Sequence, residues 1–276
     1  MKRKLLAAIW SIVLLIGIGM ILYPYISNSM AEYQQRKVIQ KMHDYVAQME
    51  TEQCGSELEQ AAAYNQTLDH VNISDPFEAE NMQSERYYGV LDFGDGIMAE
   101  LLIPDIEVDL PVYHGTDDTT LEHGVGHLCQ TSLPIGGEGT HSVLVGHTGL
   151  PGALLLTDLE QLKEGDCFYI RVINEMLTYQ VDQILVVEPD DTSSLEIVQG
   201  EDYVTLVTCT PYGINTHRLL VRGTRISGEE EERLYEEGIH TAGRMHESPW
   251  RAVLLIGVIA VPAAVGLFML VQRRME

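Results

Sequence analysis

Two uninterrupted apolar stretches lie near the two ends of the chain. Residues 5–23 and residues 252–271 contain no charged side chain. About 20 apolar residues suffice for a helix that crosses the hydrocarbon core of a bilayer. Each stretch therefore predicts a transmembrane helix. Pro262 lies inside the second stretch, and membrane helices tolerate an internal proline better than soluble helices do.

The charges that flank these stretches predict an orientation. Lys2, Arg3 and Lys4 precede the first stretch, which is also typical of a cleaved signal peptide. Its apolar run is longer than a signal core and no small-residue cleavage site directly follows, so we expect an uncleaved anchor. Arg273 and Arg274 follow the second stretch. Because basic flanks stay inside, we expect cytoplasmic termini and an extracytoplasmic segment between the stretches.

Between the two stretches the pattern changes from helical to alternating. Residues 31–70 are polar and helix-prone, residues 71–95 are irregular, and an acidic helix-like run occupies 229–237. From residue 96 onward, short runs rich in Val, Ile, Leu, Tyr and Thr are bounded by turn residues, which predicts strands. One helix is expected over 154–162, closed by Gly165. The predicted strands cover residues 97–103, 108–113, 142–146, 167–173, 176–187, 203–209 and 218–226.

Seven or eight short strands within about 130 residues predict a closed or nearly closed β-barrel. The fold class is therefore mostly β, with short helices, an N-terminal helical segment and a flanking transmembrane helix on each side. This organisation divides the chain into a cytoplasmic tail with the first span, a helical stalk, the barrel, an acidic linker, and the second span with its tail. The expected boundaries are 1–27, 28–95, 96–228, 229–249 and 250–276.

Composition and charge exclude several classes of protein. The 276 residues carry a formal net charge of −24, and residues 24–250 between the expected spans have 11 basic against 40 acidic side chains. Nucleic-acid binding needs a positive surface, so this balance argues against it. A hydrophobic content of 45% is too high for a disordered chain. Four cysteines are too few for a disulfide scaffold.

Cys209 is the cysteine best placed for chemistry. It ends the predicted strand TLVTC and precedes a turn-rich loop, where a thiol is rigidly held and reachable, as a nucleophile must be. If residues 210–217 connect an antiparallel pair, Arg218 faces Cys209. A guanidinium there would favour the thiolate and donate to a developing oxyanion. Alternatively, Arg218 decorates the strand as Arg222 and Arg225 do, and the pattern alone leaves both interpretations open.

His147 is the best-placed acid or base partner. It follows the strand HSVLV and repeats the strand-end position of Cys209, while His217 is the second candidate. His123 and His127 have a spacing that suggests a metal site, but the intervening glycines argue against the helix that would align them. HExxH and CxxC motifs do not occur, so no metal or other cofactor is expected. A Cys–His pair without a metal predicts acyl transfer through a thioester.

Three segments resemble a known family. TLVTCTPYGINTHRLLVRGTR at 205–225 resembles the catalytic signature of sortases, the cysteine transpeptidases of Gram-positive cell surfaces. The segment 127–162 resembles the stretch that contains their catalytic histidine, and ISDPFEAEN at 73–81 is similar to the lid of the pilin-polymerising class C sortases. The second apolar span is also typical of that class.

The resemblance implies an eight-stranded sortase-type barrel and assigns roles to individual residues. Cys209 would be the nucleophile, His147 the general acid and base, and Arg218 the group that orients the carbonyl. Arg218 and a protonated His147 are then expected to favour the thiolate. Two departures from the family pattern, Cys129-Gln130 and Thr148, lie outside this triad and concern the acceptor side or lid packing.

The resemblance also implies a lid made of Asp75, Pro76 and Phe77. Phe77 would lie over Cys209, Asp75 would approach Arg218 or the thiol, and Pro76 would stiffen the turn. The alternative is an Asx-Pro turn on a surface loop, for which Asp-Pro is good material.

The function implied by the resemblance is cleavage of an LPxTG-like signal between Thr and Gly, followed by transfer to a lysine amine of a second pilin. The expected partners are therefore pilin or surface proteins with such signals, together with the membrane. Anchoring of surface proteins to peptidoglycan is the alternative function. A catalytically idle, membrane-anchored binding protein is the third.

Overall fold

The computed structural model describes residues 2–68, 73–77, 85–150, 152–228, 231, 233 and 234. The chain divides into two compact units, residues 1–32 with 247–276, and residues 33–246. The expected second span at 252–271 and most of the acidic run at 229–237 lie outside the described residues.

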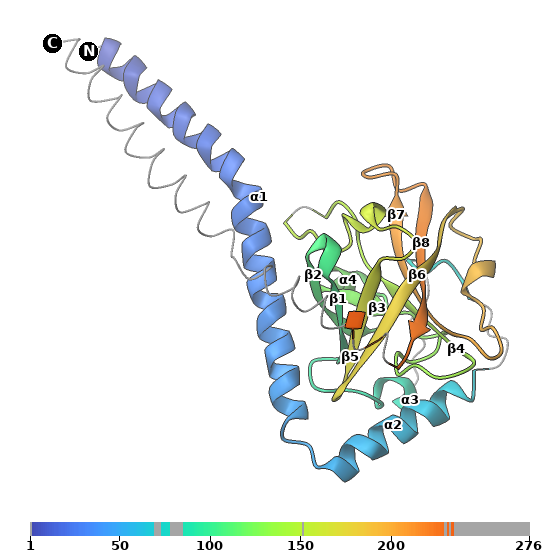
Figure 1. Ribbon diagram of the computed structural model, residues 1–276. Coiled ribbons are helices and arrows are strands. Elements are labelled where there is room, and N and C mark those ends of the chain that lie inside the picture. The colour runs from blue at the N-terminus through green and yellow to red at the C-terminus, as the bar shows by residue number, and fades with distance from the viewer. Residues whose placement is uncertain are drawn as a thin grey trace. The chain divides into compact units, whose positions relative to one another are not determined.

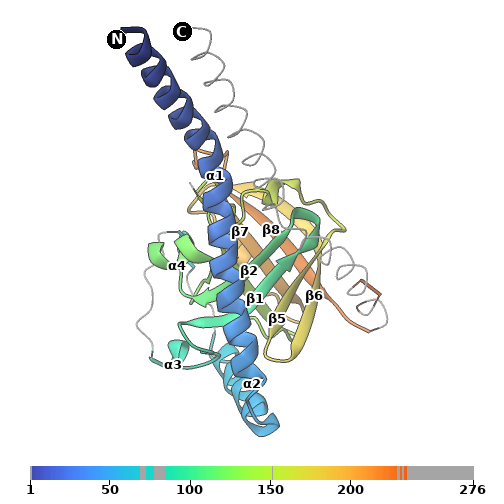
Figure 2. The ribbon, with the colours of Figure 1, turned by 90° about the vertical axis from the view of Figure 1, so that its left-hand side faces the viewer.

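The N-terminal helix α1 covers Lys2–Val46 and contains Pro24. Among the described residues it is the one helix whose length and composition would allow it to cross a membrane, and the segment that qualifies is Ile12–Val46. From residue 33 the helix belongs to the second unit, where it runs alongside β1 and β2 (Figure 2). There Ile39, Met42 and Val46 are buried at the three- and four-residue spacing of one helix face.

Helix α2, Thr51–Asn65, follows after a short turn. Its start is capped by Glu50 and Gln53, whose side chains satisfy each other's backbone N–H groups. Tyr64 on α2 is buried, and its hydroxyl donates to the carbonyl of Cys129 at 2.7 Å. The expected polar helical stalk therefore consists of two helices, the second part of α1 and α2. Both have buried side chains that pack within residues 33–246.

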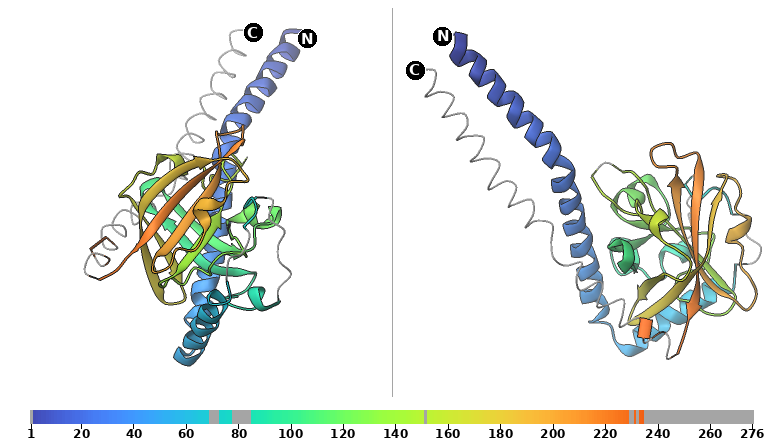
Figure 3. Two further views of the ribbon diagram at one scale, coloured as in Figure 1. Left: turned by 90° about the vertical axis from the view of Figure 1, so that its right-hand side faces the viewer. Right: turned by 45° about the horizontal axis from the view of Figure 1, so that its top comes forward.

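Eight strands form a closed barrel in the order β1-β2-β3-β4-β7-β8-β6-β5 (Figures 1 and 3). All neighbours are antiparallel except β2–β3 and β4–β7, which are parallel. The remaining short helices are α3, Glu85–Tyr88, and α4, Asp118–His123. The strands are β1 Ile97–Ile103, β2 Val108–His114, β3 Val125–His127, β4 Thr140–Val145, β5 Cys167–Val172, β6 Glu175–Val187, β7 Asp202–Thr210 and β8 His217–Ile226.

All seven predicted strands are present, with ends that differ by at most two residues. The eighth, β3, has three residues, too few for a periodic signal. It is parallel to β2, and α4 makes the connection between them. Asp117 begins α4, because its side chain accepts a hydrogen bond from the backbone N–H of Thr120 at 3.0 Å.

The prediction of a helix over residues 154–162 is wrong. This segment consists of turns and ends in a single 3₁₀ turn, Leu159–Gln161. Leu155 has a φ of 45°, which a continuous right-handed helix does not allow. Packing explains the difference, because Leu156 lies so close to Gly146 that a Cβ there would meet it at 2.7 Å. Burial of this leucine against β4 therefore determines the path of the segment.

Buried histidines make the stability of the barrel depend on pH. His141 is 1% exposed; its Nδ1 lies 2.9 Å from the carbonyl of Glu196 and its Nε2 lies 2.8 Å from the hydroxyl of Thr205. Burial lowers the pKa of His141 to about 4 and that of His127 to about 3. The unfolded chain binds these protons at pH values near 6.5, whereas the native chain does not until the pH is much lower. Their contribution to stability is therefore lost as pH falls from about 6.5.

We predict that His141→Gln makes unfolding less sensitive to acid. The variant loses about 1 kcal/mol at pH 7, because the glutamine replaces the imidazole hydrogen bonds incompletely. Between pH 6.5 and 4 its stability curve is shallower by up to about 1.4 kcal/mol per pH unit, the slope of one proton. Urea midpoints measured across this range check the prediction. Parallel curves for the variant and the parent would contradict it.

Candidate functional site

The pairing of β4 with β7 places His147 and Cys209 at the same rim of the barrel. The two strands are parallel, and their last matched pair is Val145 with Val207. His147 and Cys209 each lie two residues beyond that pair. Two further hydrogen bonds continue the pairing, from Gly146 N–H to the Val207 carbonyl at 3.0 Å and from the Thr208 hydroxyl to the Gly146 carbonyl at 2.7 Å. The two side chains therefore start from adjacent, tightly joined strands.

Strand β8 brings Arg218 to the other side of Cys209. The two residues are matched in the antiparallel β7–β8 register, and Arg218 Nη1 lies 3.5 Å from Cys209 Sγ. Arg218 is 8% exposed. Arg222 and Arg225, by contrast, form ion pairs with Asp182 and Glu231, respectively. Of the three arginines on β8, Arg218 is therefore the one that contacts the thiol, whereas the other two form ion pairs elsewhere.

The segment 73–77 lies over this rim. Asp75 forms a two-pronged ion pair with Arg218, with Nε–Oδ1 and Nη2–Oδ2 distances of 2.9 and 2.5 Å, and both side chains are 10% exposed. The Phe77 ring lies 5.0 Å from the Arg218 guanidinium carbon and 5.6 Å from the His147 ring centroid. Pro76, which lies between Asp75 and Phe77 along the chain, is buried. Phe77 thus contacts the two groups that flank the thiol.

The turn character of this segment is also present. Asp75 Oδ1 accepts a hydrogen bond from the Phe77 backbone N–H at 3.2 Å, which is the Asx turn expected for Asp-Pro. The same carboxylate therefore stabilises the turn and pairs with Arg218. The turn interpretation and the lid interpretation describe two contacts of one side chain.

Sequence reasoning missed two residues that hold the segment down. The hydroxyl of Thr192 donates to the Ile73 carbonyl at 2.9 Å. Ile73 and Phe77 both pack against a buried apolar cluster, which holds the segment beside the rim. A separation of 119 residues left no local signal for the Thr192–Ile73 contact. The cluster comprises Leu121, Leu128, Val143, Val145, Leu195, Val207 and Leu220.

Burial controls the ionisation of both reactive groups. Burial raises the pKa of the Cys209 thiol, the Asp75 carboxylate raises it further, and Arg218 only partly opposes them. Burial likewise lowers the pKa of His147, although Asp118 and Glu122 act in the opposite direction. Arg218 thus acts in the expected direction, because it lowers the pKa of the thiol, but burial outweighs it in the covered site and also disfavours a protonated His147. With segment 73–77 in place, the neutral thiol and the neutral imidazole are favoured.

The other candidate histidines have different surroundings. His217 Nε2 pairs with Glu188 at 3.3 Å, and its Nδ1 meets the Thr216 hydroxyl. His123 lies on α4, and its ring contacts the Thr119 carbonyl at 2.7 Å. His127 is fully buried, with Nδ1 2.9 Å from the Tyr87 hydroxyl. Within the described part of the chain, no group of three or more His, Cys, Asp or Glu side chains could hold a metal ion.

The remaining cysteines are buried and form no disulfide bond in the part of the chain that the structure describes: Cys54 on α2, Cys129 after β3 and Cys167 on β5. Cys129, one of the departures from the family pattern, offers its carbonyl to Tyr64 of α2. Its neighbour Gln130 has a buried side-chain oxygen with no hydrogen-bond partner among the described residues. This departure therefore concerns the contact with α2.

Comparison with known proteins agrees with this geometry. The family described as "Sortase domain" matches residues 101–226. Sortase C-1 of Actinomyces oris is 49% identical, with a TM-score of 0.61 over 63% of this chain and 99% of that chain. Sortase C of Streptococcus pneumoniae, a structure described with respect to catalysis and pilin substrate specificity, is 43% identical, with a TM-score of 0.66 over 70% and 97%.

Curated relatives match this chain at lower identity. Sortase A of Streptococcus agalactiae serotype III (strain NEM316) is 30% identical over 117 residues, which are 41% of this chain and 47% of the relative. The chain thus spans about half the length of that relative. The near-complete coverage of the sortase C structures, together with the barrel order and the strand-end residues, shows that this chain belongs to the sortase family of cysteine transpeptidases and is similar to its class C members.

Proposed function

We propose that this protein is a membrane-anchored transpeptidase that cleaves an LPxTG-like signal and joins pilin subunits through lysine isopeptide bonds. The observation that carries the proposal is the placement of Arg218 beside the Cys209 thiol, under a segment anchored by Asp75. Cys209 is the proposed nucleophile, His147 the acid and base, and Arg218 the donor to the carbonyl oxygen. The barrel at 96–228 is the proposed catalytic domain.

The first half-reaction is acylation. Once the lid has opened, His147 accepts the proton of the Cys209 thiol. The resulting thiolate attacks the carbonyl carbon of the signal's Thr, and negative charge develops on the carbonyl oxygen. Arg218, buried and fixed on β8, donates to that oxygen once Asp75 has left it. The Thr–Gly C–N bond then breaks, and His147 transfers a proton to the departing Gly amine. A thioester between Cys209 and the signal's Thr remains.

The second half-reaction is aminolysis. His147, now neutral, accepts the proton that a lysine ammonium of a second pilin loses as its amine attacks the thioester. The C–S bond breaks, the Cys209 thiolate leaves, and an isopeptide bond forms. Because the thioester keeps the acyl group activated, this exchange needs no ATP or other cofactor.

The segment 73–77 serves as a lid in this proposal. It covers the guanidinium, contacts the imidazole and packs against the adjacent buried apolar cluster. Both partners of the ion pair are only 10% exposed, so the cost of desolvation offsets most of their attraction and the net contribution is about 1 kcal/mol. The aromatic contact adds about 1 to 3 kcal/mol. A closed state favoured by roughly 2 to 3 kcal/mol leaves on the order of 1% open, which lowers apparent substrate affinity by the same fraction.

The class of acceptor follows from the lid and the relatives. The two sortase C structures are 49% and 43% identical to this chain, whereas the sortase A relative is 30% identical. This difference and the lid favour pilin polymerisation. Attachment of surface proteins to a peptidoglycan amine is the second candidate, since the first half-reaction is the same.

The orientation in the membrane is also part of the proposal. The apolar part of α1 would anchor the chain, with the second span at 252–271 and both termini in the cytoplasm. The barrel then acts outside the membrane, where substrates that carry sorting signals are available.

We predict that the full chain in detergent converts a pilin with an LPxTG-type signal into a covalent ladder. Cys209→Ala abolishes both cleavage and ladder formation, because no other group supplies the thiolate. His147→Ala and Arg218→Ala each reduce turnover by about 10²- to 10⁴-fold, through the loss of an acid–base group or of an oxyanion donor. Gel analysis and mass spectrometry detect the products.

Cys167→Ala is the matched control, because this buried thiol lies on β5 and takes no part in the proposed reaction. A single adduct with a peptidoglycan-type amine and no ladder would indicate the wall-anchoring function. Normal turnover by Cys209→Ala would overturn the whole assignment.

A second prediction concerns the lid. The double variant Asp75→Ala with Phe77→Ala reacts with iodoacetamide at Cys209 about ten- to a hundredfold faster than the parent, because the closed state is lost. Cleavage of a short signal peptide also rises, whereas polymerisation need not, since pilin docking itself displaces the lid. Asp182→Ala is the control, because it breaks a comparable two-pronged ion pair with Arg222 on the same strand. Equal reactivity of the parent and the double variant would indicate that residues 75–77 form only a turn and do not act as a lid.

A third prediction concerns orientation. In cells, a membrane-impermeant thiol reagent labels single cysteines introduced at Glu57 or Glu230 of a Cys-free variant. It does not label cysteines at Lys2 or Arg274, because both tails are cytoplasmic. Labelling of both tails from outside would contradict the orientation.

A further inference from the structure

A group of ionisable side chains lies between α1 and the barrel wall, within residues 33–246. Glu100 on β1 is 4% exposed and is matched in register with Arg171 of β5. Arg171 Nε lies 3.3 Å from Glu100 Oε2. His43 reaches the same oxygen from α1, with its Nε2 at 2.9 Å. One buried carboxylate therefore joins a helix to two strands.

A second carboxyl group lies next to the first. Asp109 of β2 lies diagonally opposite Glu100 in the β1–β2 register, where Glu100 is matched with Pro111 and Leu102 with Asp109, and its Oδ1 has no partner in the described part of the chain. Two neighbouring carboxylates repel each other unless one of them carries a proton. When the two carboxyl groups share one proton they can form a hydrogen bond, and when both are ionised they repel each other.

We propose that Glu100 and Asp109, which share one proton, form a latch that holds residues 33–46 of α1 against the barrel and that weakens when the proton is lost. The helix contributes His43 and Arg36 to the latch, β1 contributes Glu100, β2 contributes Asp109 and β5 contributes Arg171. The latch lies on the β1, β2 and β5 wall, whereas Cys209 lies at the end of β7. It is therefore a device separate from the proposed lid, and it does not depend on the proposed function.

The electrostatics of Asp109 support the direction of this switch. Burial raises the pKa of Asp109 to about 7, and the neighbouring Glu100 raises it as well, while Arg36 and His43 oppose the shift. With α1 detached, the carboxyl regains contact with water, and the loss of the burial contribution lowers its pKa below that of the docked state, although Glu100 remains beside it. As pH approaches 7, the docked state therefore holds a proton that the detached state has lost. Docking weakens as pH rises through this range, by at most tenfold in the equilibrium constant per pH unit.

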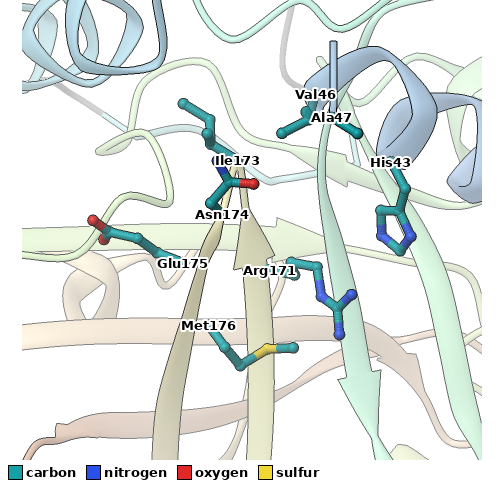
Figure 4. Close-up of a pocket in the computed structure, with 8 residues that line it drawn as sticks. All are labelled: His43, Val46, Ala47, Arg171, Ile173, Asn174, Glu175 and Met176. Atoms are coloured by element: carbon teal, nitrogen blue, oxygen red, sulfur yellow. The ribbon is translucent and has the colours of Figure 1, made fainter. Parts of the chain in front are cut away.

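An open cavity of about 360 Å³ adjoins the latch (Figure 4). His43 on α1 and Arg171 on β5 both line it, and Val46, Ala47, Asn174 and Met176 belong to its wall as well. The two groups that contact Glu100 are therefore accessible from this cavity. Water in it would allow proton exchange with the buried pair without unfolding of the barrel.

The consequence concerns the helix that also contains the candidate membrane span. α1 is continuous from Lys2 to Val46, and the latch engages its last turns. The proton of the carboxyl pair thus determines how firmly this helix is attached to the barrel. Mildly acidic conditions tighten the attachment, and conditions above pH 7 loosen it.

Hydrogen exchange of the full chain in detergent tests the proposal. We expect the opening equilibrium of residues 33–46, corrected for the intrinsic exchange rate, to rise at least fivefold between pH 5.5 and 7.5. In Asp109→Asn, an uncharged amide replaces the titrating group, and the same segment changes less than twofold. Asp95→Asn is the matched control, because Asp95 pairs with Lys41 of the same helix at 3.7 Å but is solvent-exposed. It should retain the pH dependence of the parent.

A measurement on the unmodified protein makes the test independent of the variants. The carboxyl ¹³C shift of Asp109 should titrate with a midpoint near 7. A midpoint below 5 would overturn the proposal even if Asp109→Asn did not fold. Equal pH dependence in the parent and Asp109→Asn, or opening that increases as pH falls from 7.5 to 5.5, would also overturn it.

Discussion

The pairing of β7 with its two neighbours is the constraint on which the site depends. β4 lies parallel to β7, so the two strands end at one rim and place His147 and Cys209 at equal distances beyond their last matched pair. β8 lies antiparallel to β7, so it begins at that rim with Arg218 opposite Cys209. One row across three neighbouring strands therefore contains an imidazole, a thiol and a guanidinium. A register shift of one residue in either pair would turn a side chain to the other face of the wall.

The same row explains why a short covering segment can have a large chemical effect. Arg218 is the charge that favours a thiolate at Cys209, and Asp75 neutralises that charge through two hydrogen bonds. Phe77 adds burial on the His147 side. Burial and the carboxylate then shift the thiol and the imidazole toward their neutral forms. Covering the site and lowering its reactivity are thus one event, brought about by residues within a three-residue segment.

The sequence was sufficient for those parts of the structure that local patterns determine. The alternation of apolar residues predicted seven strands, and the strand-end positions of Cys209 and His147 predicted their common rim. It was insufficient where distant packing decides. Burial of Leu156 against Gly146 replaced a predicted helix with turns, and β3 was too short to produce a pattern.

Prediction of the site's electrostatics from the sequence was limited in the same way. The charge of Arg218 was evident from the sequence, but its ion pair with Asp75 joins residues that are 143 positions apart. The thiolate is disfavoured in the covered site because burial, which no local pattern reveals, outweighs the guanidinium. The carboxyl pair of Glu100 and Asp109 was missed because its partners come from separate strands and from α1.

The central claim is that burial, together with the Asp75 carboxylate paired with Arg218, keeps the Cys209 thiol in its neutral form. The most direct test is the pKa of Cys209, obtained from the pH dependence of its alkylation rate in the parent and in Asp75→Asn. The account predicts a pKa above the ordinary thiol value in the parent and a lower pKa in the variant, with faster alkylation at pH 7 because more thiolate is present. An unchanged or higher pKa in Asp75→Asn would contradict it.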